Sequence, residues 1–172
     1  TAMSYIRDTW LKNTFGYDEP VVTNEILKGL MCEDQAIEVL TRQIPGYFRL
    51  KNEETFEDEH FTGTPDVVEK VFVEDIKCSW SLKTFVEVRT IDPLYYAQGQ
   101  VYMALTDREW FRLAHILVDT PDEIVLEEQK RFYFRFNCDE NNPHYIEASR
   151  KVEAMHYASR IIPESQRIKM FE

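Results

Sequence analysis

The sequence predicts an α/β fold in which helices flank a mixed β-sheet. The 172 residues are 44% hydrophobic and 30% charged, which is typical of a globular chain rather than a disordered one. Segments with helical and strand periodicity alternate along the chain, an order that favours a sheet covered by helices. No repeat, linker or low-complexity tract divides the sequence, so we expect a single domain over residues 1–172.

Three helices are predicted from capping residues and from the spacing of apolar residues. Each opens on a residue that accepts a hydrogen bond from the first turn, and in two of them a proline follows at the first helical position. They are expected at Asn24–Gln43, from Asp92 to about Thr106, and from Asn142 to about Ile161.

Five segments are predicted as strands, because β-branched and aromatic residues lie between turn-forming or charged residues. They are Tyr47–Leu50, Phe61–Val68, Val71–Cys78, Phe111–Val118 and Ile124–Asn137. In the last segment phenylalanines alternate with other residues, so a long strand or hairpin is expected. The acidic residues between positions 53 and 59 indicate a solvated hairpin or loop. Residues 119–172 are expected to be a strand and helix extension of a core at about 24–118.

Charge and cysteine content narrow the function. Twenty Lys and Arg against 31 Asp and Glu give a net charge of −11. This charge disfavours tight nucleic-acid binding, although a metal-dependent enzyme can be acidic because a bound cation reverses the local field. Three cysteines without a CxxC pair argue against disulfides and against an iron–sulfur cluster. Without a membrane-spanning apolar run or a signal-peptide pattern, we expect a cytoplasmic protein without membrane contact.

Two of the predicted helices carry a polar residue inside an apolar stripe. Glu33 interrupts the stripe of the first helix, and Gln98 interrupts that of the second, with Tyr102 at its edge. The stripes are Ile26, Leu30, Ile37, Leu40 and Ile44, and Leu94, Val101 and Leu105. A buried carboxylate needs a partner, a proton or a cation. The alternatives are a Glu33 that reaches solvent and a Gln98 that makes a structural hydrogen bond.

A third polar group lies on the predicted strands. Asp75 and Lys77 share one face of Val71–Cys78, and a short turn near Glu69 would bring Asp66 of the preceding strand close to Asp75. A simple salt bridge is the alternative for Asp75 and Lys77.

Together with Glu33 and Gln98, these residues form a set suited to phosphodiester hydrolysis. Carboxylates hold Mg²⁺ or Mn²⁺, the metal activates water and phosphate, and a lysine offsets the developing charge.

Four stretches resemble the PD-(D/E)XK nuclease superfamily, in particular its RecB-like and phage (lambda-type, YqaJ-like) exonuclease branch. They correspond to the helical Glu, the P-D, the D-x-K and the Q-x-x-x-Y elements of that branch, and the match runs from about Gly29 to Leu105. The stretches are Gly29…Glu33-Asp34-Gln35-Ala36, Gly63-Thr64-Pro65-Asp66, Val73-Glu74-Asp75-Ile76-Lys77-Cys78-Ser79 and Gln98-Gly99-Gln100-Val101-Tyr102.

The resemblance implies a restriction-endonuclease-like core and a role for each matched residue. Asp66, Asp75 and the backbone carbonyl of Ile76 would be metal ligands, with Glu33 supporting the metal directly or through water. Lys77 would position the water nucleophile. Gln98 would orient Lys77 or the scissile strand, and Tyr102 would line the DNA path. The implied cofactor is one or two Mg²⁺ or Mn²⁺ ions.

Further expectations concern the substrate and partners. Ser79, Trp80 and Lys83 follow Lys77 and are candidates for DNA contact; the alternative, which is the more common case, is a Trp80 that closes the core and a solvated Lys83. His115 is expected to be a satisfied core residue. The leading hypothesis is a metal-dependent DNA exonuclease of recombination, repair or phage DNA processing, with a homo-oligomer or a recombination or helicase protein as partner. The alternative is a catalytically silent nuclease fold that binds DNA or protein.

Overall fold

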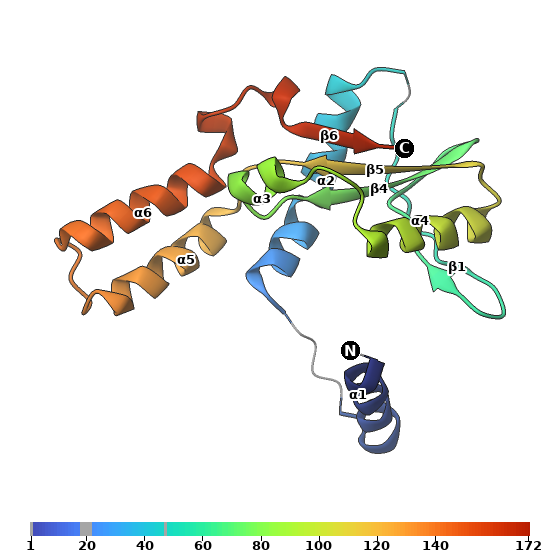
Figure 1. Cartoon of the computed structure of the whole chain (residues 1–172), viewed down its shortest axis with the longest axis horizontal. Coiled ribbons are helices and arrows are strands. Elements are labelled where there is room, and N and C mark those ends of the chain that lie inside the picture. The colour runs from blue at the N-terminus through green and yellow to red at the C-terminus, as the bar shows by residue number, and fades with distance from the viewer. Residues whose placement is uncertain (1, 18–21, 47) are drawn as a thin grey trace.

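The computed structural model describes residues 2–17, 22–46 and 48–172, and a four-stranded sheet forms the centre of the described chain (Figure 1). The strands lie in the order β3 (Val67–Val68), β4 (Phe72–Cys78), β5 (Trp110–Ile116) and β6 (Ile168–Phe171). β4 and β5 are parallel, whereas the two outer pairs are antiparallel. The predicted mixed sheet flanked by helices is confirmed.

Helices cover both faces of the sheet. On one face, α2 (Asn24–Gln43) buries Ala36 and Leu40 against Ile76 of β4 and Ile116 of β5. On the other face, α4 (Pro93–Thr106) packs Tyr102 in a cluster with residues of β4 and β5. α3 (Leu82–Glu87) and α4 form the crossover that parallel strands require. The two faces of β4 therefore contact different helices, as the alternation along Val71–Cys78 predicts.

A glycine allows α4 to lie close to the sheet. A β-carbon at Gly99 would lie 2.3 Å from Cδ1 of Phe111 on β5, a distance that real β-carbon contacts do not reach. The helix carrying Gln98 consequently packs directly against the strands that carry the site.

The prediction of a strand or hairpin at Ile124–Asn137 is wrong. The segment forms α5 (Asp122–Arg135), which packs antiparallel beside α6 (Pro143–His156), and the two helices extend together away from the sheet (Figure 1). The alternation of phenylalanines occupies only the last turns. The first turns hold good helix formers, and their buried residues, Ile124, Val125 and Gln129, lie on one helical face. α6 is shorter than expected, and short 3₁₀ helices follow it at Ala158–Arg160 and Glu164–Gln166.

Other element predictions are corrected in detail. Residues 48–50 form no strand, and Tyr47 lies outside the described residues. The predicted strand Phe61–Val68 is divided into β2 (Thr62–Gly63) and β3, with Asp66 in the break. β2 pairs with β1 (Phe56–Glu57), so the acidic segment forms a hairpin.

Three elements of the structure carry no sequence prediction. They are α1 (Ala2–Phe15), α3 and β6. α1 exposes Met3, Ile6, Trp10 and Phe15 and lies apart from the sheet in Figure 1. β6 returns the predicted extension to the core sheet beside β5. In the described ranges, no helix combines the length and apolarity that crossing a membrane requires.

Candidate active site

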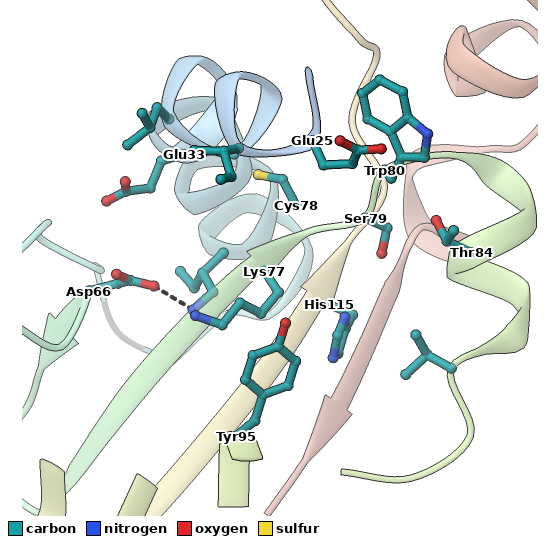
Figure 2. Close-up of a pocket in the computed structure, with 15 residues that line it drawn as sticks. Glu25, Glu33, Asp66, Lys77, Cys78, Ser79, Trp80, Thr84, Tyr95 and His115 are labelled. Carbon is teal, nitrogen blue, oxygen red and sulfur yellow. Dashed lines mark hydrogen bonds between the residues drawn. The ribbon is translucent and has the colours of Figure 1, made fainter. Parts of the chain in front are cut away.

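The site lies on an open edge of β4. β3 pairs with β4 only through Val67 and Val68, so the edge beyond Glu74 has no strand neighbour on that side in the described chain. Asp66, just before β3, takes the place of a strand: its Oδ2 accepts a hydrogen bond of 2.5 Å from the backbone N–H of Ile76 (Figure 2). In a strand the N–H and C=O of one residue point to the same side, so the Ile76 carbonyl faces the same edge.

Asp75 and Lys77 lie beside Asp66, on the β4 face covered by α4. The Nζ atom of Lys77 is 2.7 Å from Oδ2 of Asp75, whose side chain is 2% exposed. The same ammonium lies 5.1 Å from the centre of the Tyr95 ring of α4. The structure thus brings together Asp66, Asp75, Ile76 and Lys77, four of the residues singled out in the sequence.

Burial raises the pKa values of both carboxylates, and a neighbouring carboxylate adds to each shift, Asp75 for Asp66 and Glu33 for Asp75. Desolvation, with a further contribution from Asp75, raises the pKa of Asp66 to about 7, against the lowering effect of the Ile76 N–H. Desolvation also raises the pKa of Asp75, although Lys77 opposes the shift. Burial alone would lower the pKa of Lys77, but the attraction of Asp75 and Asp66 outweighs it and leaves that pKa above its usual value. Lys77 is therefore an ammonium ion at neutral pH.

Glu33 lines the same cavity but has a cationic partner. Its Oε1 lies 3.2 Å from Nζ of Lys51, and Figure 2 shows the carboxylate on the far side of Asp66 from Lys77. The apolar stripe expected around it is only half buried, because Ile26 and Leu30 are 46% and 68% exposed and form a wall of the cavity. Glu33 is thus a boundary residue, the alternative that its sequence left open.

The donor set fits a magnesium-like ion of low protein coordination. Across the described ranges, no three or more His, Cys, Asp or Glu side chains lie close enough together to form a complete metal site. Mg²⁺ needs only one or two carboxylates, with water and substrate phosphate completing its shell. Asp66, Asp75 and the Ile76 carbonyl on one edge meet that requirement, and two carboxylates facing one ammonium leave a negative charge for a cation to balance.

Gln98 and Tyr102 form a pair on α4. The Gln98 Nε2 donates a hydrogen bond of 2.7 Å to the Tyr102 hydroxyl. Tyr102 is 8% exposed and packs in the core, so the structure places its ring inside the protein and not on an open DNA path. The buried face of α4 is Gly99, Tyr102 and Thr106, whereas Leu94 of the expected stripe is exposed. The structural hydrogen bond suggested as an alternative for Gln98 is present.

A cavity of about 550 Å³ runs along the open edge from Asp66 past Lys77. Ser79 and Trp80 line it, as their position after Lys77 predicts. Lys83 does not line it: the side chain is exposed on α3, with Nζ 3.9 Å from Oε1 of Glu87. The polar cavity residues Glu25, Thr84 and Tyr95 carry no sequence prediction, and His115 on β5, expected only in the core, lines the cavity as well (Figure 2).

His115 is 9% exposed, in keeping with the expected core position, but it also borders the cavity. It lies directly opposite Lys77 in the parallel register of β4 and β5 and lines the cavity. Burial lowers the pKa of His115, and the neighbouring Lys77 and Lys169 lower it further, so the ring is neutral at pH 7. The signal that could have found it is the pairing of the two strands, which brings residues 38 positions apart in sequence side by side.

Two buried cations fix the elements around the cavity. Lys28 of α2 donates to the carbonyls of Trp80 and Val118 at 3.0 and 3.1 Å, and burial lowers its pKa to about 8. On the α2 face of β4, the side chains of Arg49 and Glu74 form a fully buried ion pair with Nε 2.5 Å from Oε2. These bonds set the position of β4 and of the chain that follows it.

Comparisons with solved structures identify the fold. A phage-related exonuclease from Haemophilus somnus 129PT superposes with a TM-score of 0.71 at 22% identity, over 99% of this chain and 70% of that one. An alkaline exonuclease (LHK-Exo) from Laribacter hongkongensis gives 0.56 at 16% identity, over 88% and 81%. A complex of LHK-Exo with dAMP gives 0.55 at 19% identity, over 71% and 64%. No protein-family model and no curated protein matches the sequence. The resemblance to the phage-exonuclease branch is confirmed at the level of the fold.

Proposed function

We propose that this protein is a divalent-metal-dependent DNA nuclease, and more specifically an exonuclease of DNA recombination, repair or phage DNA processing. One observation carries the proposal: two buried carboxylates and one ammonium, Asp66, Asp75 and Lys77, meet at an open strand edge beside a cavity of about 550 Å³. The exonuclease fold of the structural neighbours supports it.

Asp66, Asp75 and the carbonyl of Ile76 would hold the cation, Mg²⁺ or Mn²⁺. When bound, such an ion polarises a phosphodiester and acidifies an attacking water. The protein's part is to keep both carboxylates on one rigid edge. Asp66 is fixed by its hydrogen bond from Ile76, and Asp75 lies on the central strand β4. Glu33, which lines the same cavity near Asp66, would act on the metal through water, since Lys51 already pairs with it.

Lys77 would stabilise charge rather than accept a proton. Its raised pKa keeps it protonated, so it can donate hydrogen bonds to water or to a phosphate oxygen as negative charge develops. The Tyr95 ring beneath its Nζ and the Asp75 carboxylate restrict where the ammonium can point. Gln98 would act one layer further from the substrate, by holding the Tyr102 hydroxyl.

The test is degradation of end-labelled single- and double-stranded DNA with Mg²⁺, Mn²⁺ or EDTA. We expect metal-dependent cutting, a stepwise product ladder, and a loss of at least 100-fold in rate for Lys77→Ala. Lys130→Ala is the matched control, because Lys130 is exposed on α5, away from the cavity. Equal rates for the two variants, or cutting in EDTA, would contradict the proposal.

A second candidate is the silent nuclease fold that binds DNA or protein. It is favoured by the net charge of −11 and by the ion pair that occupies Glu33. The raised pKa values of Asp66 and Asp75 argue against it. Two buried carboxylates in this environment destabilise the fold, and a site without activity would not be expected to retain them. Titration calorimetry with Mn²⁺ separates the two: a nuclease site binds the ion, and Asp66→Asn abolishes the binding.

The proposed partner is DNA, with a second copy of the chain or a recombination or helicase protein to enclose it. An acidic chain gains little from counterion release, so affinity of the isolated chain for DNA should fall only slightly with salt. We propose an intracellular, cytoplasmic site of action. Anisotropy of labelled DNA across a salt series measures the slope, and a steep slope for the isolated monomer would contradict this expectation.

A further inference from the structure

The row of site residues on β4 continues one step beyond Lys77. Asp75, Lys77 and Ser79 lie on the same face, because side chains alternate and the ladder extends through the bond from the Ser79 N–H to the Ile116 carbonyl. Successive members of the row are separated by about 6.6 Å along the strand. Ser79 lies at the end of the cavity away from Asp66 (Figure 2).

A buried hydroxyl at this end of the cavity has no hydrogen-bond partner in the described part of the chain, and two more polar side chains line the cavity beside it. The Ser79 hydroxyl is buried, with the residue only 5% exposed. Tyr95 and His115 line the same cavity with their ring centres 6.0 Å apart, and Figure 2 shows both side chains beside Lys77. The nearby Thr84 hydroxyl differs, because it is committed to the N-terminus of α3. Buried polar groups are nearly always paired, so the unpaired Ser79 hydroxyl beside two more polar side chains of the same cavity indicates a missing ligand.

The chemistry of the three groups selects the ligand. A serine hydroxyl, a phenol and a neutral imidazole can each donate one hydrogen bond, and the Lys77 ammonium donates beside them. A phosphate group accepts at every oxygen and satisfies all of them at once. One acidic residue, Glu25, lines this end of the cavity. It is exposed and lies at the rim beside Trp80.

We propose that Ser79, Tyr95 and His115 form a phosphate subsite that holds the phosphodiester next to the one being cut. This inference rests on the proposed nuclease function and names how the same site grips its substrate. It also reconciles a net charge of −11 with DNA as substrate, because neutral donors bind a phosphate without the counterion release that depends on Lys and Arg.

The test combines protein variants with DNA carrying one methylphosphonate, which removes a phosphate's charge and one acceptor oxygen. For the wild type, a methylphosphonate next to the cleaved bond should lower kcat/KM about tenfold or more, as loss of hydrogen bonds to a charged group does. Ser79→Ala and His115→Gln should lose a similar factor on ordinary DNA and show little further loss on the substituted DNA. Tyr96→Phe, exposed on the same helix as Tyr95, is the matched control and should behave as wild type.

A second measurement does not depend on cleavage. Anisotropy of a fluorescein-labelled 12-nucleotide single strand in EDTA should show weaker binding, by about fivefold or more, for Ser79→Ala and His115→Gln than for Tyr96→Phe. If the wild type binds but never cuts, the proposed nuclease function fails, and this comparison still decides the subsite. An equal methylphosphonate penalty in variants and wild type, or equal affinities of all four proteins, would overturn the subsite. Circular dichroism confirms that each variant is folded.

Discussion

Replacing Asp66 with asparagine should stabilise the metal-free protein while abolishing its activity. Asparagine keeps the oxygen that accepts the hydrogen bond from Ile76 but carries no charge. In the wild type, burial and Asp75 raise the pKa of Asp66 from its ordinary value near 3.8 to about 7. The folded protein therefore binds this proton more tightly than the unfolded chain, and its stability falls as the pH rises from about 4 through 7.

The pKa shift sets an upper limit on the effect. Roughly three pKa units correspond to about 4 kcal/mol of unfolding free energy at pH 8. Because Asp75 and Lys77 share the shift with Asp66, we expect about 1–3 kcal/mol in the variant, which for a chain of this length raises Tm by roughly 2–12 °C. At pH 4 both side chains are neutral, so the difference in Tm should nearly vanish.

Thermal unfolding followed by circular dichroism at pH 4 and pH 8, with EDTA or Mn²⁺, measures these quantities. Saturating Mn²⁺ should stabilise the wild type by about 3 kcal/mol at 100 times its Kd and leave Asp66→Asn unchanged. The reasoning is that burial and charge repulsion at Asp66 destabilise the metal-free protein. It would be refuted if Asp66→Asn were less stable than the wild type at pH 8, or if the gain in stability were equally large at pH 4.

Three further substitutions test how the fold supports the site. Glu74→Gln leaves the buried guanidinium of Arg49 without its counter-charge and should cost about 3–5 kcal/mol in urea unfolding, whereas replacing both residues by Met and Leu should cost much less; equal costs would contradict this. Gly99→Ala places a methyl group 2.3 Å from Phe111 and should cost about 1–3 kcal/mol, measured as a lower Tm, unless Phe111→Leu is added to relieve the clash. Lys169→Met removes a donor shared by three carbonyls at the end of α3, so hydrogen exchange there should accelerate while β4 stays protected; uniform acceleration would refute a local role.

Residues close together in sequence are those whose placement could be predicted. The alternation along β4 fixes Asp75 and Lys77 on one face, and the short turn before it brings Asp66 beside them. The capping residues of α2, α4 and α6 likewise act within one turn, so the starts of these helices are predicted correctly. Such features depend on backbone periodicity and local hydrogen bonds, which neighbouring residues determine.

Long-range packing determines the features for which the sequence left alternatives open or led to a wrong prediction. Ile124–Asn137 is a helix because α6 covers its apolar face, although its phenylalanines alternate as in a strand. Glu33 lies at a cavity wall because α2 buries the neighbouring face.

The sequence by itself determined the acid, amide and lysine set and the order of the elements that carry it. Only the tertiary structure decided which groups meet. The parallel register of β4 and β5 sets His115 beside Lys77, and the crossover helix α4 adds Tyr95 to the same cavity. Their positions depend on contacts between segments far apart in the chain. The periodicity within one segment does not depend on those contacts and therefore cannot predict them.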